Sequence, residues 1–216
     1  YDADAENRVI AAILYRFSDV PFDRALSIVK TMPEKQKEKI LDEALNRRAS
    51  FDAPLRELEH AYYTFDILMD YGAFRDIQRH RMCTQTNQRV TTIHGFDIPE
   101  EISEAGEGER FREAMYASSE LYDKMKTEFP HESQYVVPLA FKKRVLITWN
   151  LRELHHFISL RSGSKGHISY RRIAQECWRK LNEIQPLLAK YIRVNMSGGS
   201  ASWASTMFNP EYNYAP

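Results

Sequence analysis

The sequence predicts an α+β fold with a helical N-terminal annex, and three observations favour it. Long stretches carry apolar residues at intervals of three to four, which indicates amphipathic helices. A few short runs rich in aromatic and β-branched residues indicate strands. The strands are few and the helices are segregated from them, which is typical of α+β proteins. With 216 residues, the chain is long enough for one sizeable core or at most two small ones.

The first 50 residues predict three helices, which together make the annex. The first helix places four apolar residues on one face. The second begins with a proline, which suits a first helical turn. The third is highly charged and follows Thr31, a candidate cap. The predicted ranges are Ala3–Tyr15, Pro21–Lys30 and Pro33–Asn46.

The main domain is predicted at residues 51–195. Residues 196–216 are rich in Ser, Gly, Asn, Tyr and Pro and are predicted to form a tail or extension. Aromatic and β-branched residues favour strands in the main domain, and amphipathic periodicity with terminal Pro or Gly favours helices between them. The predicted strands are Tyr62–Leu68, Val90–Phe96 and Arg144–Trp149. The predicted helices are Tyr71–Arg81, Glu109–Phe129, Asn150–Arg161 and a long one within Gly166–Tyr191.

The composition excludes several classes of function. Thirty basic and thirty acidic residues give a formal net charge of zero, which argues against a general affinity for nucleic acid or an anionic membrane. No run approaches the ~20 apolar residues that span a bilayer, and no secretory signal is visible. Two cysteines, Cys83 and Cys177, imply neither a disulfide framework nor a Cys-based zinc site. We therefore expect a cytoplasmic protein that binds neither nucleic acid nor membrane.

A charged tripeptide, Arg79-His80-Arg81, is the first candidate for chemistry. Guanidinium groups suit phosphate and other anionic oxygens, and imidazole donates or accepts near neutral pH. The predicted helix Asn150–Arg161 repeats Asn150, Leu154, Phe157 and Arg161 on one face, which suits a ligand with a flat ring and an anionic group. A structural interpretation stays open, because Asn150 is also a helix cap in a capping-box pattern with Glu153 and Arg161 complements the helix dipole.

Two other kinds of site are less favoured. A metal site on a helix needs histidines or carboxylates at suitable spacing, and no His-x-x-x-His pair occurs, so packed histidines are expected. A thiol nucleophile at Cys83 would be activated by the tripeptide before it, but no catalytic motif surrounds it, so a buried, inert thiol is expected. The histidines considered are His60, His80, His155, His156 and His167.

The motifs and their spacing resemble the flavin-dependent thymidylate synthases, the ThyX family. Arg79-His80-Arg81 is similar to the start of that family's signature. The segment Leu58-Glu59-His60-Ala-Tyr-Tyr-Thr64-Phe65 is similar to the family's Leu-Glu-His-x-x-Phe-Thr-Phe strand. The segment Asn150 to Arg161 resembles its Asn-x-Arg-x-Leu-x-x-Phe-x-x-Leu-Arg helix. The resemblance covers roughly Pro54 to Glu183 and implies a ThyX-like mixed sheet flanked by long helices.

This resemblance implies an FAD-dependent thymidylate synthase that reductively methylates dUMP to dTMP, with methylenetetrahydrofolate and NADPH as co-substrates. It implies a homo-oligomer, a homotetramer in the family, or a sister ThyX-like domain as partner, and no metal. Arg161 is the implied catalytic residue, because a guanidinium can polarise the uracil. The implied cofactor contacts are Arg79, His80, Arg81, Asn150 and His156. The implied substrate contacts, for a dUMP-type nucleotide, are Arg79, Arg161, Gln88 and Arg89.

The turn after the tripeptide departs from the family pattern. The family has Ser-x-Asn-Glu-x-Ser-x-Arg-Tyr, whereas this chain has Thr84-Gln-Thr-Asn87-Gln-Arg89-Val90. The chain also begins at Tyr1 without Met, as a processed product, an expressed segment or part of a longer polypeptide would. These features resemble the second half of longer chains with two copies of the domain. The second hypothesis is therefore a non-catalytic copy that serves as an interface or a nucleotide-binding subunit.

Overall fold

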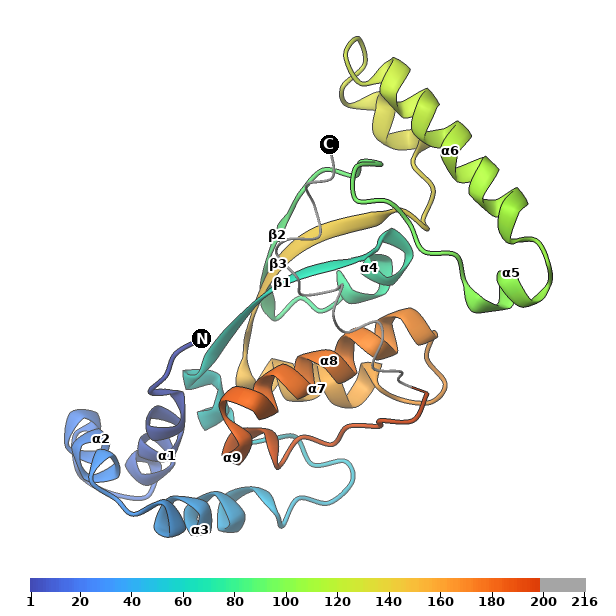
Figure 1. Cartoon of the computed structure of the whole chain (residues 1–216). Coiled ribbons are helices and arrows are strands. Elements are labelled where there is room, and N and C mark those ends of the chain that lie inside the picture. Colours follow the sequence, from blue (N-terminus) through green and yellow to red (C-terminus); the bar gives the residue numbers. More distant parts are fainter. Residues whose placement is uncertain (199–216) are drawn as a thin grey trace. The chain divides into compact units, whose positions relative to one another are not determined.

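The computed structural model describes residues 1–198, which contain helices and a small three-stranded sheet (Figure 1). The predicted tail lies outside these residues except for its first three. The strand order is β1-β3-β2, so the central strand is the last one in the chain. The α+β class is confirmed. The strands are β1 (Tyr62–Asp70), β2 (Cys83–Asn87) and β3 (Lys142–Asn150).

Strands β1 and β3 run antiparallel. The amide of Tyr71 donates to the carbonyl of Phe141 (2.9 Å), and the amide of Leu151 donates to the carbonyl of Ala61 (2.8 Å). Between these two points, the hydroxyls of Thr64 and Thr148 share a 2.8 Å hydrogen bond. Strands β1 and β3, which carry parts of the predicted motifs, are therefore hydrogen-bonded neighbours in the sheet.

Each of these strands runs directly into a helix whose first turn is capped by the last strand residue. Asp70 Oδ1 accepts from the Ala73 amide (2.6 Å) at the start of α4 (Tyr71–Ile77). Asn150 Oδ1 accepts from the Glu153 amide (2.9 Å) at the start of α7 (Leu151–Arg161). The predicted cap at Asn150 is confirmed, since short polar side chains satisfy the open amides of a first turn.

The strand predicted at Val90–Phe96 is wrong, because that segment holds only an isolated bridge from Phe96 to Phe141. The strand lies earlier, at β2, whose polar residues form an edge beside β3. The reason is that strand propensity depends on available partners more than on residue type. Gly95, with φ of 67°, also turns the chain out of an extended path.

Two predicted helices are shorter than their patterns. Helix α4 ends at Ile77, so the tripeptide at 79–81 follows the helix instead of extending it. The helix predicted within Gly166–Tyr191 is α8 (Ile168–Ile184), followed by the separate short α9 (Pro186–Ala189). Pro186 explains the break, because proline has no amide hydrogen to continue α8 and begins α9 instead.

The described residues divide into two compact units. The first unit comprises residues 1–65, residues 80–84 and the described residues from 147 onward. The second comprises residues 66–79 and 85–146. The strands of the sheet have residues in both. The predicted division at residues 50 and 195 remains a prediction.

The first unit contains the three predicted annex helices and the helices of the later motif. Apolar faces of α1, α7 and α8 make its core, in which Ile10, Phe157 and Ile173 are fully buried. Helix α1 packs against α2, and α7 packs against α8 and η1. The remaining elements of this unit are α1 (Ala5–Arg16), α2 (Phe22–Lys30), α3 (Glu34–Leu45) and the 3₁₀ helix η1 (Arg56–His60).

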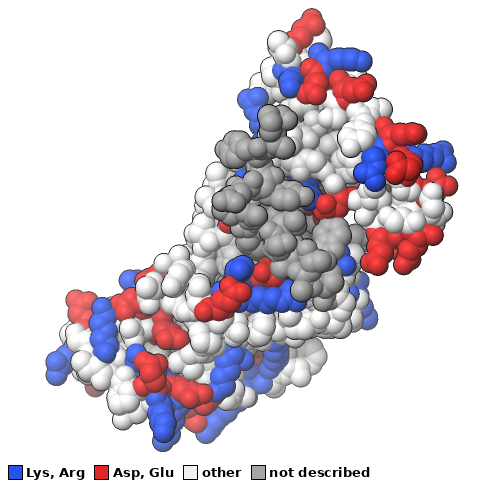
Figure 2. Space-filling view, in the orientation of Figure 1, with Lys and Arg blue, Asp and Glu red and all other residues white. Residues whose placement is uncertain are grey.

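The second unit has its own core around the long helix α6 (Gly108–Met125). The short helix α5 (Glu100–Glu104) and the 3₁₀ helix η2 (Glu132–Val136) pack against α6. Figure 2 shows acidic side chains gathered over α5, where glutamates in the first turn complement the helix dipole. Across residues 1–198, no helix has both the length and the apolar character that a membrane span requires. The core residues of this unit are Val90, Met115, Tyr122, Val137 and Phe141.

Candidate functional site

His80 lies at the centre of a polar arrangement in the first unit, although the sequence showed it only as part of a charged tripeptide. Its side chain is 4% exposed. Its Nδ1 lies 3.1 Å from Glu153 Oε1, and Arg161 donates from Nε to its Nε2 at 3.0 Å. An arginine Nε–H only donates, so Nε2 accepts and Nδ1 carries the proton that faces Glu153. The fold thus joins His80 and Arg161, which are 81 residues apart in the chain.

Aromatic rings hold the His80 ring in place. Phe157 meets it edge-on, with centroids 5.1 Å apart and an interplanar angle of 88°. The ring of His156 is a second neighbour, with centroids 5.7 Å apart. Phe157 is itself stacked on the buried Trp149 at 4.7 Å. The imidazole is therefore fixed by packing as well as by hydrogen bonds.

Two residues beside His80 complete the arrangement. The guanidinium of Arg161 lies over the ring of Tyr170, 5.1 Å from its centroid. The Cys83 thiol donates to the His80 carbonyl at 2.9 Å, which ties down the turn after the histidine. Cys83 is half-buried, so the expectation that it is a buried thiol is wrong: it lies in edge strand β2. Its contact with the backbone supports the structural interpretation of this cysteine.

A cavity of about 460 Å³ opens beside the start of α7, and all of its lining residues belong to the first unit. Asn150 and His156, two of the predicted cofactor contacts, line it. Three arginines and three carboxylates also line it, together with an apolar group. The charged residues are Arg48, Arg152, Arg193, Asp52, Glu59 and Glu153, and the apolar residues include Phe51, Pro54 and Met82.

The segment before η1 forms one wall of this cavity, and arginines hold it. Arg193 donates to the carbonyls of Arg48, Ala49 and Ser50, each at 2.9 Å. Arg48 donates to the carbonyl of Tyr191 at 2.8 Å. Burial, and then the nearby charge of Arg193, lower the pKa of Arg48. These hydrogen bonds hold the wall in place, and the cavity lining as a whole has as many carboxylates as arginines.

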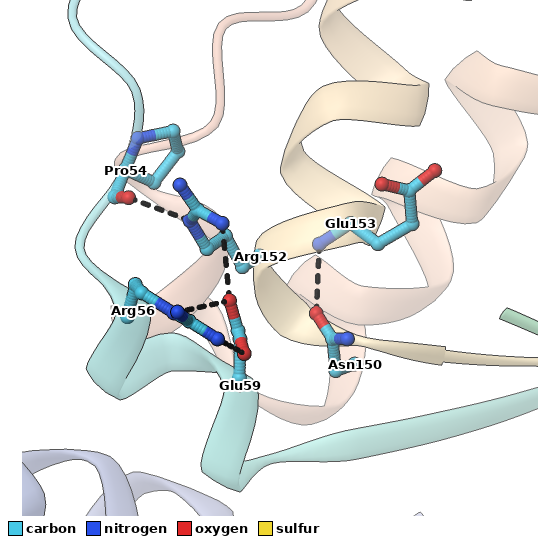
Figure 3. A network of polar contacts seen from close by, with 6 residues as sticks. All are labelled: Pro54, Arg56, Glu59, Asn150, Arg152 and Glu153. Carbon is cyan, nitrogen blue, oxygen red and sulfur yellow. Dashed lines mark hydrogen bonds and ion pairs between the residues drawn. The ribbon is translucent and has the colours of Figure 1, made fainter. Parts of the chain in front are cut away.

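Arg152 and Glu59 make a second fixed edge of the cavity (Figure 3). Arg152 donates to the carbonyl of Pro54 (2.9 Å) and to Glu59 (3.0 Å), and Arg56 also bonds Glu59. The bond from Arg56 is the largest cause of the lowered pKa of Glu59. Figure 3 also shows that the Glu153 carboxylate points away from the Asn150 cap. The predicted capping box is thus only half made, because the Glu153 carboxylate bonds His80 instead.

His155 is a further cavity residue, and the sequence reasoning missed it as a ligand contact. It is 2% exposed, and its Nε2 has no hydrogen-bond partner among residues 1–198. Burial, and then the charge of Arg48, lower the pKa of His155 to about 3. The imidazole is therefore neutral at pH 7, and it adds a polar atom without charge to the cavity.

The low pKa of His155 predicts that stability falls as the pH falls. In the unfolded chain the imidazole titrates near ~6.5, so above that pH neither state is protonated. Below it, the unfolded chain binds a proton that the folded chain excludes until about pH 3. The free energy of unfolding should drop by about 2 kcal/mol from pH 6.5 to 5 through this residue. Denaturant unfolding of wild type and His155→Leu checks this, and parallel pH profiles would contradict it.

Four predicted contacts are not among the residues that line the cavity. Arg79, Arg81, Gln88 and Arg89 are all exposed. Arg81 belongs to the first unit, and the other three belong to the second. Arg79 makes a long ion pair with Asp76, at 3.9 Å.

The structure shows further candidate functional residues that the apolar periodicity of the sequence did not indicate. Arg152, Glu153 and His155 lie in the predicted helix motif and could have been found from their helical spacing to Asn150 and His156. Arg48 and Arg193 lie far apart in the chain and show no local signal.

In the second unit, Arg144 bonds Asp66 at 2.8 Å, and its Nη2 has no partner among the described residues. A charged residue at the start of a predicted strand was the available signal for Arg144. Within residues 1–198, no group of three or more metal-ligating side chains is present.

Comparison with known proteins shows the family of this chain. A model of the family described as thymidylate synthase complementing protein matches residues 1–187. The chain belongs to this family. The match includes the predicted annex helices as well as the motifs around His80 and Asn150.

Within the thymidylate synthase complementing protein family, three relatives are informative. A UPF0159 protein of Chlamydia muridarum is 36% identical over 194 residues, which is 89% of this chain and 36% of the relative. A UPF0159 protein of Thermoplasma acidophilum is 32% identical over 192 residues, 86% of this chain and 38% of the relative. A flavin-dependent thymidylate synthase of Pyrococcus abyssi is 32% identical over 142 residues, 59% of this chain and 56% of the relative. The chain thus spans little more than a third of the UPF0159 relatives.

Proposed function

We propose that this chain is a flavin-dependent thymidylate synthase that reductively methylates dUMP to dTMP. Methylenetetrahydrofolate would supply the carbon, and NADPH would reduce the FAD. Membership of the family supports the reaction class. The observation that carries the proposal is the cavity of the first unit, whose wall includes Asn150 and His156. Beside it, the buried His80 is hydrogen-bonded to the half-buried Arg161.

The cavity residues fit a flavin dinucleotide. Its volume, about 460 Å³, falls within the ~300–1,000 Å³ of typical cofactor sites. Arg48, Arg152 and Arg193 offer guanidinium donors that suit a pyrophosphate, although three carboxylates of the same lining balance their charge. His155 Nε2 is a buried polar atom without a hydrogen-bond partner among residues 1–198, as expected where a ligand supplies one. Asn150, Arg152 and His156 would hold the group, and bound reduced flavin would supply the hydride.

Arg161 would hold and polarise the pyrimidine. A guanidinium stabilises negative charge that develops on a uracil oxygen, and it needs no reorganisation if it is already fixed. Here Nε is held by His80, and the guanidinium lies over the Tyr170 ring. No thiol nucleophile is required for this role, which agrees with the structural contact of Cys83.

The exposed residues of the tripeptide and the turn would complete the binding of the anionic ligands. Arg79 and Arg81 would contact the flavin, and Arg79, Gln88 and Arg89 would contact the nucleotide. Arginine and glutamine donors on an exposed segment are accessible to phosphate oxygens. The chain would assemble with further copies of itself as a homo-oligomer, or with a sister ThyX-like domain.

The flavin spectrum of the purified protein tests the proposal. The protein should be yellow, with a flavin absorbance band that is released on denaturation and that shifts when dUMP is added. A colourless protein that takes up neither added FAD nor dUMP would exclude this function.

A specific observation favours a second candidate, a non-catalytic copy that serves as an interface or nucleotide-binding subunit. The chain spans only 36% and 38% of the two UPF0159 relatives, so those proteins contain further sequence beyond this domain. The turn after Arg81 also lacks the family's acidic residue at the expected place. This candidate predicts nucleotide binding without turnover, and association only with a sister domain. Steady production of dTMP by the isolated chain would rule it out.

The two roles of Asn150 can be separated by substitution. Asn150→Ala should cost about 1 kcal/mol, because the Glu153 amide loses its cap. It should also weaken FAD retention, because Asn150 lines the cavity. Asn150→Ser is the matched control, since serine caps a helix but lacks the amide. Denaturant unfolding and FAD titration of both variants measure the two effects. Equal FAD affinity in Asn150→Ala and wild type would refute the cofactor contact.

A further inference from the structure

We propose that Glu153 is a positioning residue that acts through His80 to aim the guanidinium of Arg161. The proposal rests on the proposed function of Arg161 as a nucleotide contact. Glu153 touches no ligand in this role. It sets the tautomer of His80, and the tautomer decides whether Arg161 can bond to the ring.

The first step is the direction of the Glu153 side chain. A glutamate at the third position of a helix ordinarily reaches back to the amide of the capping residue. Here Asn150 alone makes the cap, and the Glu153 carboxylate bonds His80, 73 residues away in the chain. Glu153 thus makes a long-range hydrogen bond to His80 instead of the local bond to the amide of the capping residue.

The second step is the hydrogen-bond logic of the ring. A neutral imidazole has one N–H and one acceptor nitrogen. A carboxylate only accepts, so Glu153 favours the proton on Nδ1. An arginine Nε–H only donates, so Arg161 requires the lone pair on Nε2. Both neighbours favour the same tautomer, with the proton on Nδ1. The hydrogen bonds between Glu153 and His80 and between His80 and Arg161 are therefore compatible with each other.

The third step is the burial that makes this selection strong. The side chains of His80 and Glu153 are 4% and 12% exposed, so water competes little for either bond. Phe157 packs edge-on against the ring and opposes its rotation. If the Nδ1 proton lost its acceptor, the other tautomer would place an N–H against the Nε–H of Arg161. The guanidinium would then have to leave the His80 ring, and its placement over Tyr170 would be disturbed.

NMR of protein labelled with ¹⁵N histidine, without ligand, tests the tautomer directly. The chain has seven histidines, so His80→Asn identifies the His80 signals by their absence. Wild type should show protonated Nδ1 and bare Nε2 at His80. Glu153→Leu should lose this pattern, and Glu153→Gln should keep it, because its amide oxygen still accepts. Wild-type His80 with its proton on Nε2 would overturn the proposal, as would an unchanged pattern in Glu153→Leu.

Binding of dUMP measures the consequence for Arg161. Affinity should fall about tenfold in Glu153→Leu and return to within threefold of wild type in Glu153→Gln. Glu183→Gln, an exposed change in helix α8, is the matched control and should change neither measurement. Full dUMP affinity in Glu153→Leu would also overturn the positioning role. If wild type itself binds no dUMP, the proposed function fails, while the tautomer of His80 still decides the proposal for Glu153.

Discussion

Arg161→Ala should abolish dUMP binding, with an affinity loss of at least about 100-fold, while the protein stays folded. Charge-assisted hydrogen bonds contribute about 1.5–3 kcal/mol each, and a guanidinium can make two to a planar ligand. A loss of about 100-fold corresponds to ~2.8 kcal/mol, within that range. Isothermal titration with dUMP gives the affinity, and circular dichroism shows whether the fold is retained.

Two further variants make the Arg161 experiment specific. Arg161→Lys keeps the positive charge but loses the Nε donor to His80, so its affinity should lie between those of wild type and Arg161→Ala. Lys180→Ala removes an exposed cation from the same unit and should bind dUMP as wild type does. An Arg161→Ala protein with wild-type affinity would refute the assigned role and favour the purely structural interpretation of this residue.

Trp149→Ala should destabilise the protein by about 3–5 kcal/mol, the range for removing a large aromatic side chain from a core. Trp149 is fully buried on β3, stacks on Phe157 at 4.7 Å and meets Phe65 edge-on at 5.6 Å. Because Phe157 in turn supports His80, the loss should also loosen the candidate site. Guanidinium unfolding followed by circular dichroism measures the free energy.

Trp149→Phe is the matched variant for this experiment. It keeps an aromatic ring in the stack and removes an indole N–H that has no hydrogen-bond partner among residues 1–198. An unsatisfied buried donor costs about 1–3 kcal/mol, so removing it offsets part of the lost volume. Trp149→Phe should therefore cost less than half as much as Trp149→Ala. Equal losses in the two variants would contradict the importance of the aromatic stack.

The comparison between sequence and structure separates local from long-range causes. Helices α1, α2, α3, α6 and α7 lie within a few residues of their predictions, because apolar periodicity and caps are local properties. The cap at Asn150 was readable for the same reason. The strand predicted at Val90–Phe96 failed because pairing with β3, not residue type, selected Cys83–Asn87.

The candidate site shows the same division. The sequence determined by itself which side chains are available, namely His80, Asn150, His156 and Arg161, and where the helix that carries the last three begins. Only the tertiary structure decided that Glu153 faces His80 instead of its own cap and that Arg161 bonds the same ring. It alone brought Arg48 and Arg193 together around one cavity. Caps and periodicity depend on neighbours within one or two helical turns, whereas these contacts join segments more than 70 residues apart and form only when the core closes.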